Sequence, residues 1–161
     1  MNLPIRVIIA DGYNLSIKVL ERFFAKNESI NIVASANEAK DVFKKLNDFP
    51  ADVILLDLSI QRLDGLQVIS YIKSLFPRLK IIIYSMIDDP EILHRAFDLG
   101  AAGFITKDAD YKQVEEAIQF AANGGKFLCR QATQSVKSDR YFDMFMRSGE
   151  LKNQAHSQLN N

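Results

Sequence analysis

The sequence predicts a single α/β domain in which a five-stranded parallel sheet is covered by helices on both faces. Short β-branched apolar runs alternate five times with segments whose apolar residues recur at helical spacing. The run Lys80–Tyr84 contains three successive isoleucines, as expected for a strand that is covered on both faces. The loops between these segments are brief, and right-handed crossovers then favour a doubly wound sheet, (βα)5.

The first half of the chain supplies three strands and three helices. The strands are predicted at Ile5–Ala10, Ile30–Ala34 and Val53–Leu56, which are rich in β-branched and aliphatic residues. Each strand is followed by apolar residues at helical spacing, and the third helix is expected to end near Pro77. The three helical stripes are Leu15, Val19, Leu20 and Phe23; Ala39, Val42, Phe43 and Leu46; and Leu66, Ile69, Ile72 and Leu75.

The second half supplies two further units. After the strand Lys80–Tyr84, the triplet Asp88-Asp89-Pro90 places an acid at the N-cap and a proline in the first turn of a helix that Gly100 closes. Ala101–Thr106 is predicted as the fifth strand and Tyr111–Ala122 as the fifth helix, which Asn123-Gly124-Gly125 terminates.

Beyond residue 128 the pattern changes. Residues 129–149 are interpreted as a C-terminal helical extension or a linker remnant, because the apolar residues of Tyr141–Met146 allow a helix over Gln131–Arg147. This helix could dock on the domain, extend the last helix or pair two chains as a homodimer. Residues 150–161 are polar and rich in Asn and Gln, which predicts a disordered tail.

Composition narrows the class of protein. Twenty basic and twenty acidic residues give a net charge of zero, so no overall field attracts the chain to nucleic acid or to an anionic membrane. Cys129 is the only cysteine, which excludes an internal disulfide and a cysteine-based metal cluster. The sequence has no signal-peptide layout and no apolar run of about 20 residues, so we expect a cytoplasmic protein.

Four reactive residues stand at the carboxyl ends of the predicted strands: Asp11, Asp57, Ser85 and Lys107. In a doubly wound sheet these ends meet at one rim, where ligands bind. An aspartate carboxylate can attack phosphorus, and the acyl phosphate needs a cation or a lysine to neutralise its charge. Lys107 supplies one positive charge, and the Ser85 hydroxyl could hydrogen-bond a phosphoryl oxygen. The carboxylates of Asp11 and Asp57, with the backbone carbonyl of Ser59, suit Mg²⁺.

Five motifs carry a resemblance to the receiver domain of bacterial two-component response regulators, over about Ile5–Leu128. They are Val7-Ile8-Ile9-Ala10-Asp11, Val53-Ile54-Leu55-Leu56-Asp57-Leu58, Leu63-Asp64-Gly65, Ile83-Tyr84-Ser85 and Gly100-Ala101-Ala102-Gly103-Phe104-Ile105-Thr106-Lys107-Asp108. The resemblance implies a flavodoxin-like receiver domain over residues 1–128, phosphorylated on Asp57 by a sensor histidine kinase or phosphotransfer protein with Mg²⁺. It also implies that Ser85 is the switch hydroxyl, Lys107 the invariant lysine and Phe104 the switch aromatic.

The chain departs from the family pattern at three positions. Gly12 replaces the second of two acids after the first strand, so we expect weak Mg²⁺ binding. Gln61 replaces a proline, and Phe104 lacks the hydroxyl of the more frequent tyrosine. The first departure keeps open an alternative, a pseudo-receiver that signals through protein contacts without phosphorylation. A phosphatase with an aspartate nucleophile is disfavoured, because position 59 is Ser59 rather than a second acid.

The family resemblance also bears on partners. The residues around Lys107 and the segment Gly124–Leu128 are similar to the branch whose receivers precede a helix-turn-helix DNA-binding domain. No basic recognition helix is visible here, so we expect no direct nucleic-acid binding by this chain, which is either a solitary receiver or part of a longer regulator. On the family's output face, the candidate contact residues are Leu93, Phe97, Phe104 and Tyr111, and a homodimer could form through this face as well as through the C-terminal helix.

Overall fold

The structure is a computed structural model, and it describes residues 2–63, 65–136 and 151–153. Five strand–helix units follow one another, as the alternation of apolar patterns predicts. They are β1 (Ile5–Ala10), α1 (Asn14–Phe24), β2 (Ile30–Ala36), α2 (Ala39–Asp48), β3 (Val53–Leu56), α3 (Gln67–Leu75), β4 (Lys80–Ser85), α4 (Pro90–Asp98), β5 (Gly103–Thr106) and α5 (Tyr111–Ala122).

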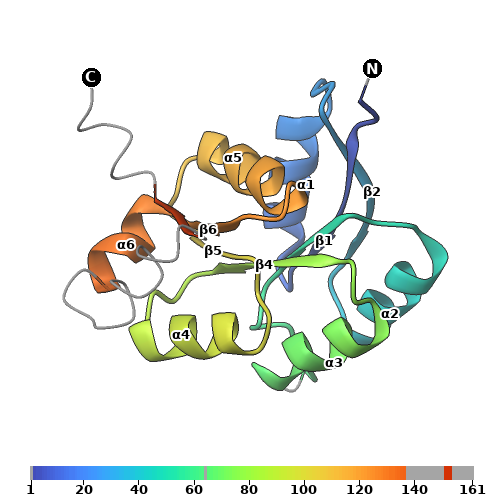
Figure 1. Cartoon of the computed structure of the whole chain (residues 1–161). Helices are drawn as coiled ribbons and strands as arrows, with labels where there is room; N and C mark the ends of the chain where they lie inside the picture. Colours follow the sequence, from blue (N-terminus) through green and yellow to red (C-terminus); the bar gives the residue numbers. More distant parts are fainter. Residues whose placement is uncertain (1, 64, 137–150, 154–161) are drawn as a thin grey trace.

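The strands form one parallel sheet in the order β2-β1-β3-β4-β5-β6-β7. Helices α1 and α5 cover one face, and α2, α3 and α4 cover the other (Figure 1). The strand order reverses direction between β1 and β3, because β2 lies on one side of β1 and all later strands lie on the other. The predicted doubly wound, flavodoxin-like architecture is therefore confirmed.

The sheet has seven strands rather than the predicted five. Gly124, with φ of 90°, turns the chain after α5, and β6 (Lys126–Leu128) then runs parallel to β5. After β6 come α6 (Arg130–Val136) and, later in the chain, β7 (Leu151–Asn153), which pairs with β6. A strand of three residues is too short to show an alternating pattern, which is why the sequence did not reveal either addition.

The predicted C-terminal helix is therefore observed in part. Helix α6 begins at Arg130, one residue before the predicted start, and is described as far as Val136. The remainder of Gln131–Arg147, including Tyr141–Met146, lies outside the described residues. Leu151–Asn153, which the sequence assigned to a disordered tail, form a strand, whereas residues 154–161 also lie outside the described part.

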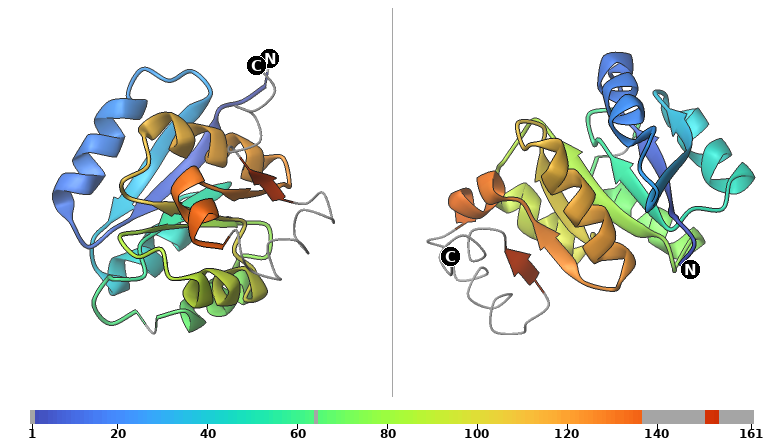
Figure 2. Two further views of the ribbon diagram at one scale, coloured as in Figure 1. Left: turned by 90° about the vertical axis from the view of Figure 1, so that its left-hand side faces the viewer. Right: turned by 90° about the horizontal axis from the view of Figure 1, so that it is seen from above.

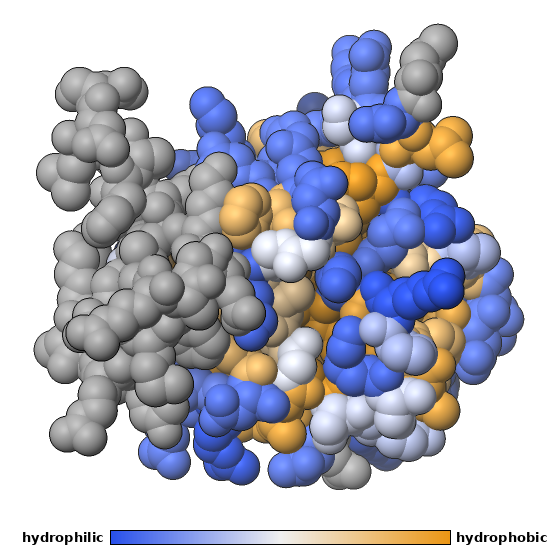
Figure 3. All heavy atoms as spheres, viewed as in Figure 1, coloured by the Kyte–Doolittle hydropathy of each residue, from blue (hydrophilic) through white to orange (hydrophobic). Residues whose placement is uncertain are grey.

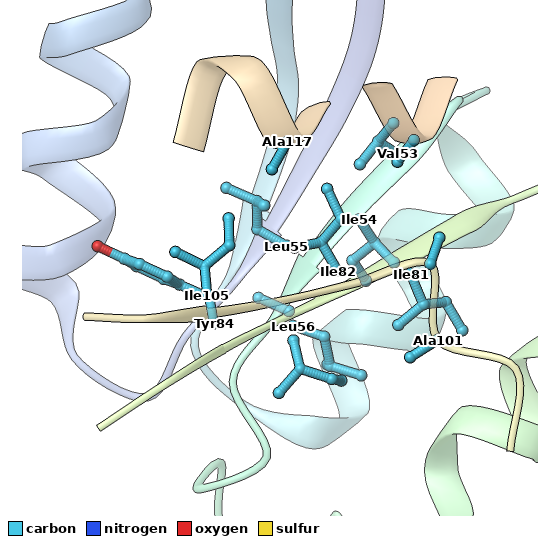
Figure 4. Packing of buried hydrophobic residues seen from close by; sticks show 14 of the residues in the cluster. Val53, Ile54, Leu55, Leu56, Ile81, Ile82, Tyr84, Ala101, Ile105 and Ala117 are labelled. Atoms are coloured by element: carbon cyan, nitrogen blue, oxygen red, sulfur yellow. The ribbon is translucent and has the colours of Figure 1, made fainter. Parts of the chain in front are cut away.

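The core lies between the sheet and its two helical layers. All four residues of β3 are buried, and their side chains alternate between the two faces of the sheet. Figure 4 shows Leu55 directed towards Ala117 of α5, and Leu56 on the opposite side of the strand. Within the described residues, no helix has the length and apolar character needed to cross a bilayer. Figure 3 shows hydrophobic residues interspersed with hydrophilic ones on the face that it displays.

Candidate functional site

Strand register brings the predicted site residues to one rim, which we call the carboxyl rim. Ala10 of β1 pairs with Leu56 of β3, so the following residues, Asp11 and Asp57, are neighbours. The Asp57 backbone N–H donates to the Ala10 carbonyl at 2.8 Å. On the other side, Ser85 of β4 pairs with Thr106 of β5, and the Lys107 N–H donates to the Ser85 carbonyl at 2.8 Å. The backbone therefore fixes the starting point of each functional side chain.

Lys107 joins the two carboxylates. Its ammonium Nζ lies 2.7 Å from Asp11 Oδ2 and 2.8 Å from Asp57 Oδ2. Asp11 is fully buried, Asp57 is 2% exposed, and the Lys107 side chain is 8% exposed. One ammonium therefore faces two carboxylates in a site with little access to water, so with these three groups ionised the site carries a net negative charge that favours a cation.

The same contacts determine the protonation of the site. Burial disfavours the charged form of Asp57, but hydrogen bonds from Lys107 and from the backbone N–H of Ser59 outweigh burial and hold its pKa below the ordinary aspartate value. Burial likewise works against the Lys107 ammonium, but Asp11 and Asp57 together raise its pKa. Near neutral pH, Asp57 is therefore an ionised carboxylate and Lys107 an ammonium, which are the states needed for a nucleophile and a charge partner.

Ser85 lies at the rim without joining this cluster. Its Oγ accepts a hydrogen bond of 3.0 Å from the backbone N–H of Ile87, and none of the hydrogen bonds described links the hydroxyl to Asp11, Asp57 or Lys107. The structure therefore brings three of the four predicted groups into direct contact. The serine hydroxyl would have to exchange its local bond to reach a group on Asp57.

The donor set allows a test of the expected Mg²⁺ site. Asp11 Oδ1 accepts from the Tyr13 N–H at 2.9 Å, whereas Oδ2 has no hydrogen-bond partner among the described residues, although the Lys107 ammonium is close to it as an ion pair. Asp57 Oδ1 accepts from the Ser59 N–H at 2.8 Å, which places the Ser59 backbone next to this carboxylate. An incompletely bonded buried carboxylate oxygen, a second carboxylate and a nearby carbonyl fit a magnesium ion that keeps several waters.

The set of oxygen ligands for a magnesium ion lacks a third carboxylate. Within residues 2–63, 65–136 and 151–153, no three His, Cys, Asp or Glu side chains are grouped as in a metal site. The position that would supply the third is Gly12, and a Cβ atom there would meet only Ile60, with its nearest atom 3.8 Å away. Gly12 also lines a pocket of about 550 Å³ together with Ser59 and Arg62. Neither space nor backbone conformation therefore requires a glycine here.

Two tyrosine rings near the site were missed by the sequence reasoning. The Lys107 ammonium lies 5.1 Å from the centroid of the Tyr13 ring and 5.5 Å from that of Tyr84, within cation–π range. Burial raises the pKa of the Tyr84 phenol, so it stays protonated. Both residues were identifiable, because Tyr13 follows Asp11 by two positions and Tyr84 directly precedes Ser85.

The four candidate residues of the expected output face differ in exposure. Phe104 is fully buried, and Leu93 and Phe97 are 2% and 5% exposed. Tyr111, at 37%, is the one of the four candidate contact residues with substantial exposure. Which of the four contacts a partner stays a prediction, and in this structure β6 pairs with β5 while α6 packs against α4 and β5.

Comparison with known proteins identifies the family of the chain. The family model of the response regulator receiver domain matches residues 7–119. Among curated relatives, the transcriptional regulatory protein DegU of Brevibacillus brevis is 23% identical over 132 residues, which cover 82% of this chain and 56% of DegU. The response regulator GacA of Pseudomonas viridiflava is 24% identical over 132 residues, covering 82% of this chain and 62% of GacA. The chain thus spans less than two thirds of these relatives.

Solved structures show the same relationship. The isolated receiver domain of RcsB from Salmonella enterica serovar Typhimurium, determined with the phosphomimetic BeF₃⁻, is 27% identical with a TM-score of 0.75. The alignment covers 82% of this chain and 98% of that domain. The receiver domain of NarL from Mycobacterium tuberculosis is 28% identical with a TM-score of 0.71, covering 76% of this chain and 99% of that one. With its fold, its carboxyl rim and its matched residues, this chain belongs to the response regulator receiver family of two-component systems.

Proposed function

We propose that the chain accepts a phosphoryl group on Asp57 from a sensor histidine kinase or a phosphotransfer protein, with Mg²⁺, in the cytoplasm. The observation that carries this proposal is the contact of one buried ammonium, on Lys107, with the carboxylates of Asp57 and Asp11. In this function the chain is a phosphoacceptor that reacts once per donor, and not an enzyme acting on other substrates.

The transfer uses groups that already lie in place. An oxygen of Asp57 attacks phosphorus while the P–N bond of a phosphohistidine, or the P–O bond of an acyl phosphate, breaks and its electron pair leaves with the donor. Asp57 Oδ2 is released from Lys107, whose ammonium then pairs with a phosphoryl oxygen. Bound Mg²⁺, held by Asp11, Asp57 and the Ser59 carbonyl, would supply further neutralisation of the phosphoryl charge.

The product changes the local charge, which is how it would act as a signal. A phosphoryl group brings additional negative charge and strong acceptor oxygens. The Ser85 hydroxyl would exchange its bond from the Ile87 N–H for one to the phosphoryl group. Because Ile87 is in the exposed loop between β4 and α4, this exchange would move the start of α4 and so alter a protein-binding surface.

Phosphorylation with acetyl phosphate tests the proposal. The purified chain is incubated with acetyl phosphate and Mg²⁺ and examined by intact-mass spectrometry, beside an Asp57→Asn variant. We expect a mass increase of one phosphoryl group that requires Mg²⁺ and is lost in the variant. An increase that persists in Asp57→Asn would place the modification elsewhere and contradict the assignment.

A second candidate function is a pseudo-receiver that signals without phosphorylation, and Gly12 is the observation that favours it. The glycine removes one acidic ligand at a position with room for a side chain. If no adduct forms under conditions that label a standard receiver, the pseudo-receiver becomes the better account. The search for a partner would then use the unmodified chain.

A further inference from the structure

The segment Lys126–Val136, which we call the cap, lies along the outer edge of β5 and beside α4. Gly103 and Phe104 of β5 pair with Phe127 and Leu128 of β6. Helix α6 then packs against α4 and β5, and Figure 1 shows it at the end of the molecule next to these elements. Figure 2 shows α6 in orange, facing the viewer in the left view and at the left of the molecule in the right view. Strand β5 is consequently an interior strand of the sheet.

The cap is attached by apolar burial and by specific hydrogen bonds. Five successive or near-successive cap side chains are at most 1% exposed: Phe127, Leu128, Cys129, Ala132 and Thr133. Three bonds come from α5 or β5. The Gln113 side-chain Oε1 accepts from the Arg130 N–H at 3.0 Å, its Nε2 donates to the Gln131 Oε1 at 3.4 Å, and the Cys129 N–H donates to the Phe104 carbonyl at 3.2 Å.

The cap therefore encloses the residue that resembles the family's switch aromatic. Phe104 has paired neighbours on each side, Ile83 in β4 and Leu128 in β6, and its side chain has no exposed surface. With β5 at the edge of a sheet, a side chain at this position could turn towards solvent. Here the cap occupies the space beyond β5, so Phe104 cannot become exposed while the cap is docked.

The cap also contacts the strand end that carries the site. Cys129 Sγ lies 3.4 Å from the Thr106 backbone N and 3.5 Å from Thr106 Oγ1. The next residue is Lys107, whose ammonium pairs with Asp11 and Asp57. A movement of the end of β5 would therefore change the contacts of Cys129 with Thr106.

We propose that the cap is an internal ligand of the surface formed by α4 and β5: it excludes outside partners while docked, and it opens as a unit without unfolding of the domain. The hinge follows Gly124-Gly125, whose N–H groups donate to the Ala121 and Phe120 carbonyls and so close α5, with φ of 90° at Gly124. This opening is a property of the resting chain and does not depend on phosphorylation of Asp57.

The chain contains its own reporter of cap opening, because its single cysteine, Cys129, is fully buried inside the cap. The rate at which a thiol reagent labels Cys129 is measured by intact mass in the native chain, in the denatured chain and over low urea concentrations. We expect native labelling roughly a hundredfold slower than denatured labelling, with a weaker dependence on urea than global unfolding shows.

A variant tests the attachment directly. Gln113→Ala removes two hydrogen bonds to the cap and should accelerate labelling roughly tenfold, with little change in the urea midpoint of the whole domain. Gln119→Ala, the same replacement in the same helix but beside Asn123 and Arg6, is the control and should leave the labelling rate unchanged. Hydrogen exchange at Phe127 and Cys129 should increase in parallel with labelling in Gln113→Ala.

Three outcomes would overturn the proposal. The cap is not docked if native labelling is within a few-fold of the denatured rate. It does not open separately if native labelling has the urea dependence of global unfolding. The Gln113 bonds do not hold the cap if Gln113→Ala and Gln119→Ala are labelled at the same rate. The urea dependence is measured on the unmodified chain, so the test stands even if Gln113→Ala fails to fold.

Discussion

At the scale of single residues, Gly12 determines how many carboxylates the carboxyl rim offers to a cation. Lys107 balances one of the two carboxylates, and Asp11 Oδ2 is left without a hydrogen-bond donor of its own among the described residues. Gly12 is not in the left-handed region of φ, and a side chain at this position would meet only ordinary contact distances. Its effect is therefore electrostatic, through the ligand that it does not provide.

We predict that Gly12→Asp raises the affinity for Mg²⁺ by roughly tenfold or more, because one further charged oxygen ligand becomes available. Without Mg²⁺ the same variant should lose about 1 kcal/mol of unfolding free energy, since a third carboxylate is placed near Asp11 and Asp57 with one ammonium among them. Thermal unfolding over a Mg²⁺ titration measures the two effects together. Gly12→Asn, which has nearly the same shape but no charge, is the matched control, and equal Mg²⁺ affinities for the two variants would contradict the electrostatic explanation.

The site was largely predictable at this scale, but the bonds of its side chains were not. Asp11, Asp57 and Lys107 stand at strand ends in the sequence, and parallel strands bring such ends to one rim. The distance from Ser85 to that group was not predictable, because a hydroxyl rotates to the nearest partner, here the Ile87 N–H. The two ring contacts of Lys107 likewise depend on side-chain orientation, which a linear pattern does not contain.

At the scale of secondary-structure elements, local signals identified the starts of α4 and α5 but not the last two strands, β6 and β7. Asp89 accepts from the Glu91 N–H at 2.8 Å directly before Pro90, as the sequence predicted for the start of α4. Helix α5 has the predicted bounds and begins after Asp110, whose side chain accepts from the Gln113 N–H at 2.9 Å. Strand β6 has no comparable signal, since its pairing depends on β5, which is more than twenty residues earlier in the chain.

The N-cap residue of α5, Asp110, gives a prediction at this scale. Asp110→Ala should lower the unfolding free energy by about 1 kcal/mol, because it removes the side-chain acceptor of the Gln113 N–H and leaves only the 3.1 Å bond to the Asp110 carbonyl. Urea unfolding measures the change. Asp108→Ala replaces an exposed acid two residues earlier and outside the helix, so it should have less than half that effect. A loss of the same size in the two variants would mean that the capping bond is not the cause.

At the scale of the whole molecule, Asp52 ties together the amino ends of three strands. Its carboxylate accepts three hydrogen bonds from Arg6 of β1: one of 2.8 Å from the backbone N–H, and two of 3.1 Å and 2.8 Å from the guanidinium. The Asp52 carbonyl accepts a bond of 3.0 Å from the N–H of Lys80, at the start of β4. Asp52 itself directly precedes β3 in the chain. The hydrogen bonds from the Arg6 side chain outweigh burial and lower the pKa of Asp52 below its usual value of 3.8.

A lowered pKa means that Asp52 stabilises the fold when it is ionised. This contribution is present above the unfolded pKa of about 4 and is lost as the pH falls through the lower folded value. We predict that Asp52→Asn is less stable than the unmodified chain at pH 7, and that the difference shrinks as the pH is lowered below about 4. Urea midpoints across this pH range provide the measurement, with Asp108→Asn as a control. A difference independent of pH would show that packing, rather than charge, is responsible.

The overall architecture followed from the sequence, but the width of the sheet did not. Five repeated units and continuous apolar runs such as Ile81–Ile83 leave little choice of topology. The contacts of β6 with β5, which carries Phe104, and of α6 with α4, which carries Leu93 and Phe97, come instead from a later part of the chain. Such long-range contacts have no local signature, so the sequence did not reveal them.

The seven-stranded arrangement also affects self-association by strand pairing. Without β6, the backbone groups and apolar residues of Gly103–Thr106 would form an open sheet edge, which is a template for pairing with another chain. With β6 in place, that edge is transferred to β7, whose pairing with β6 spans only Leu151–Asn153. A chain shortened before Lys126 should therefore aggregate more readily at high concentration than the full chain, even where its carboxyl rim is intact.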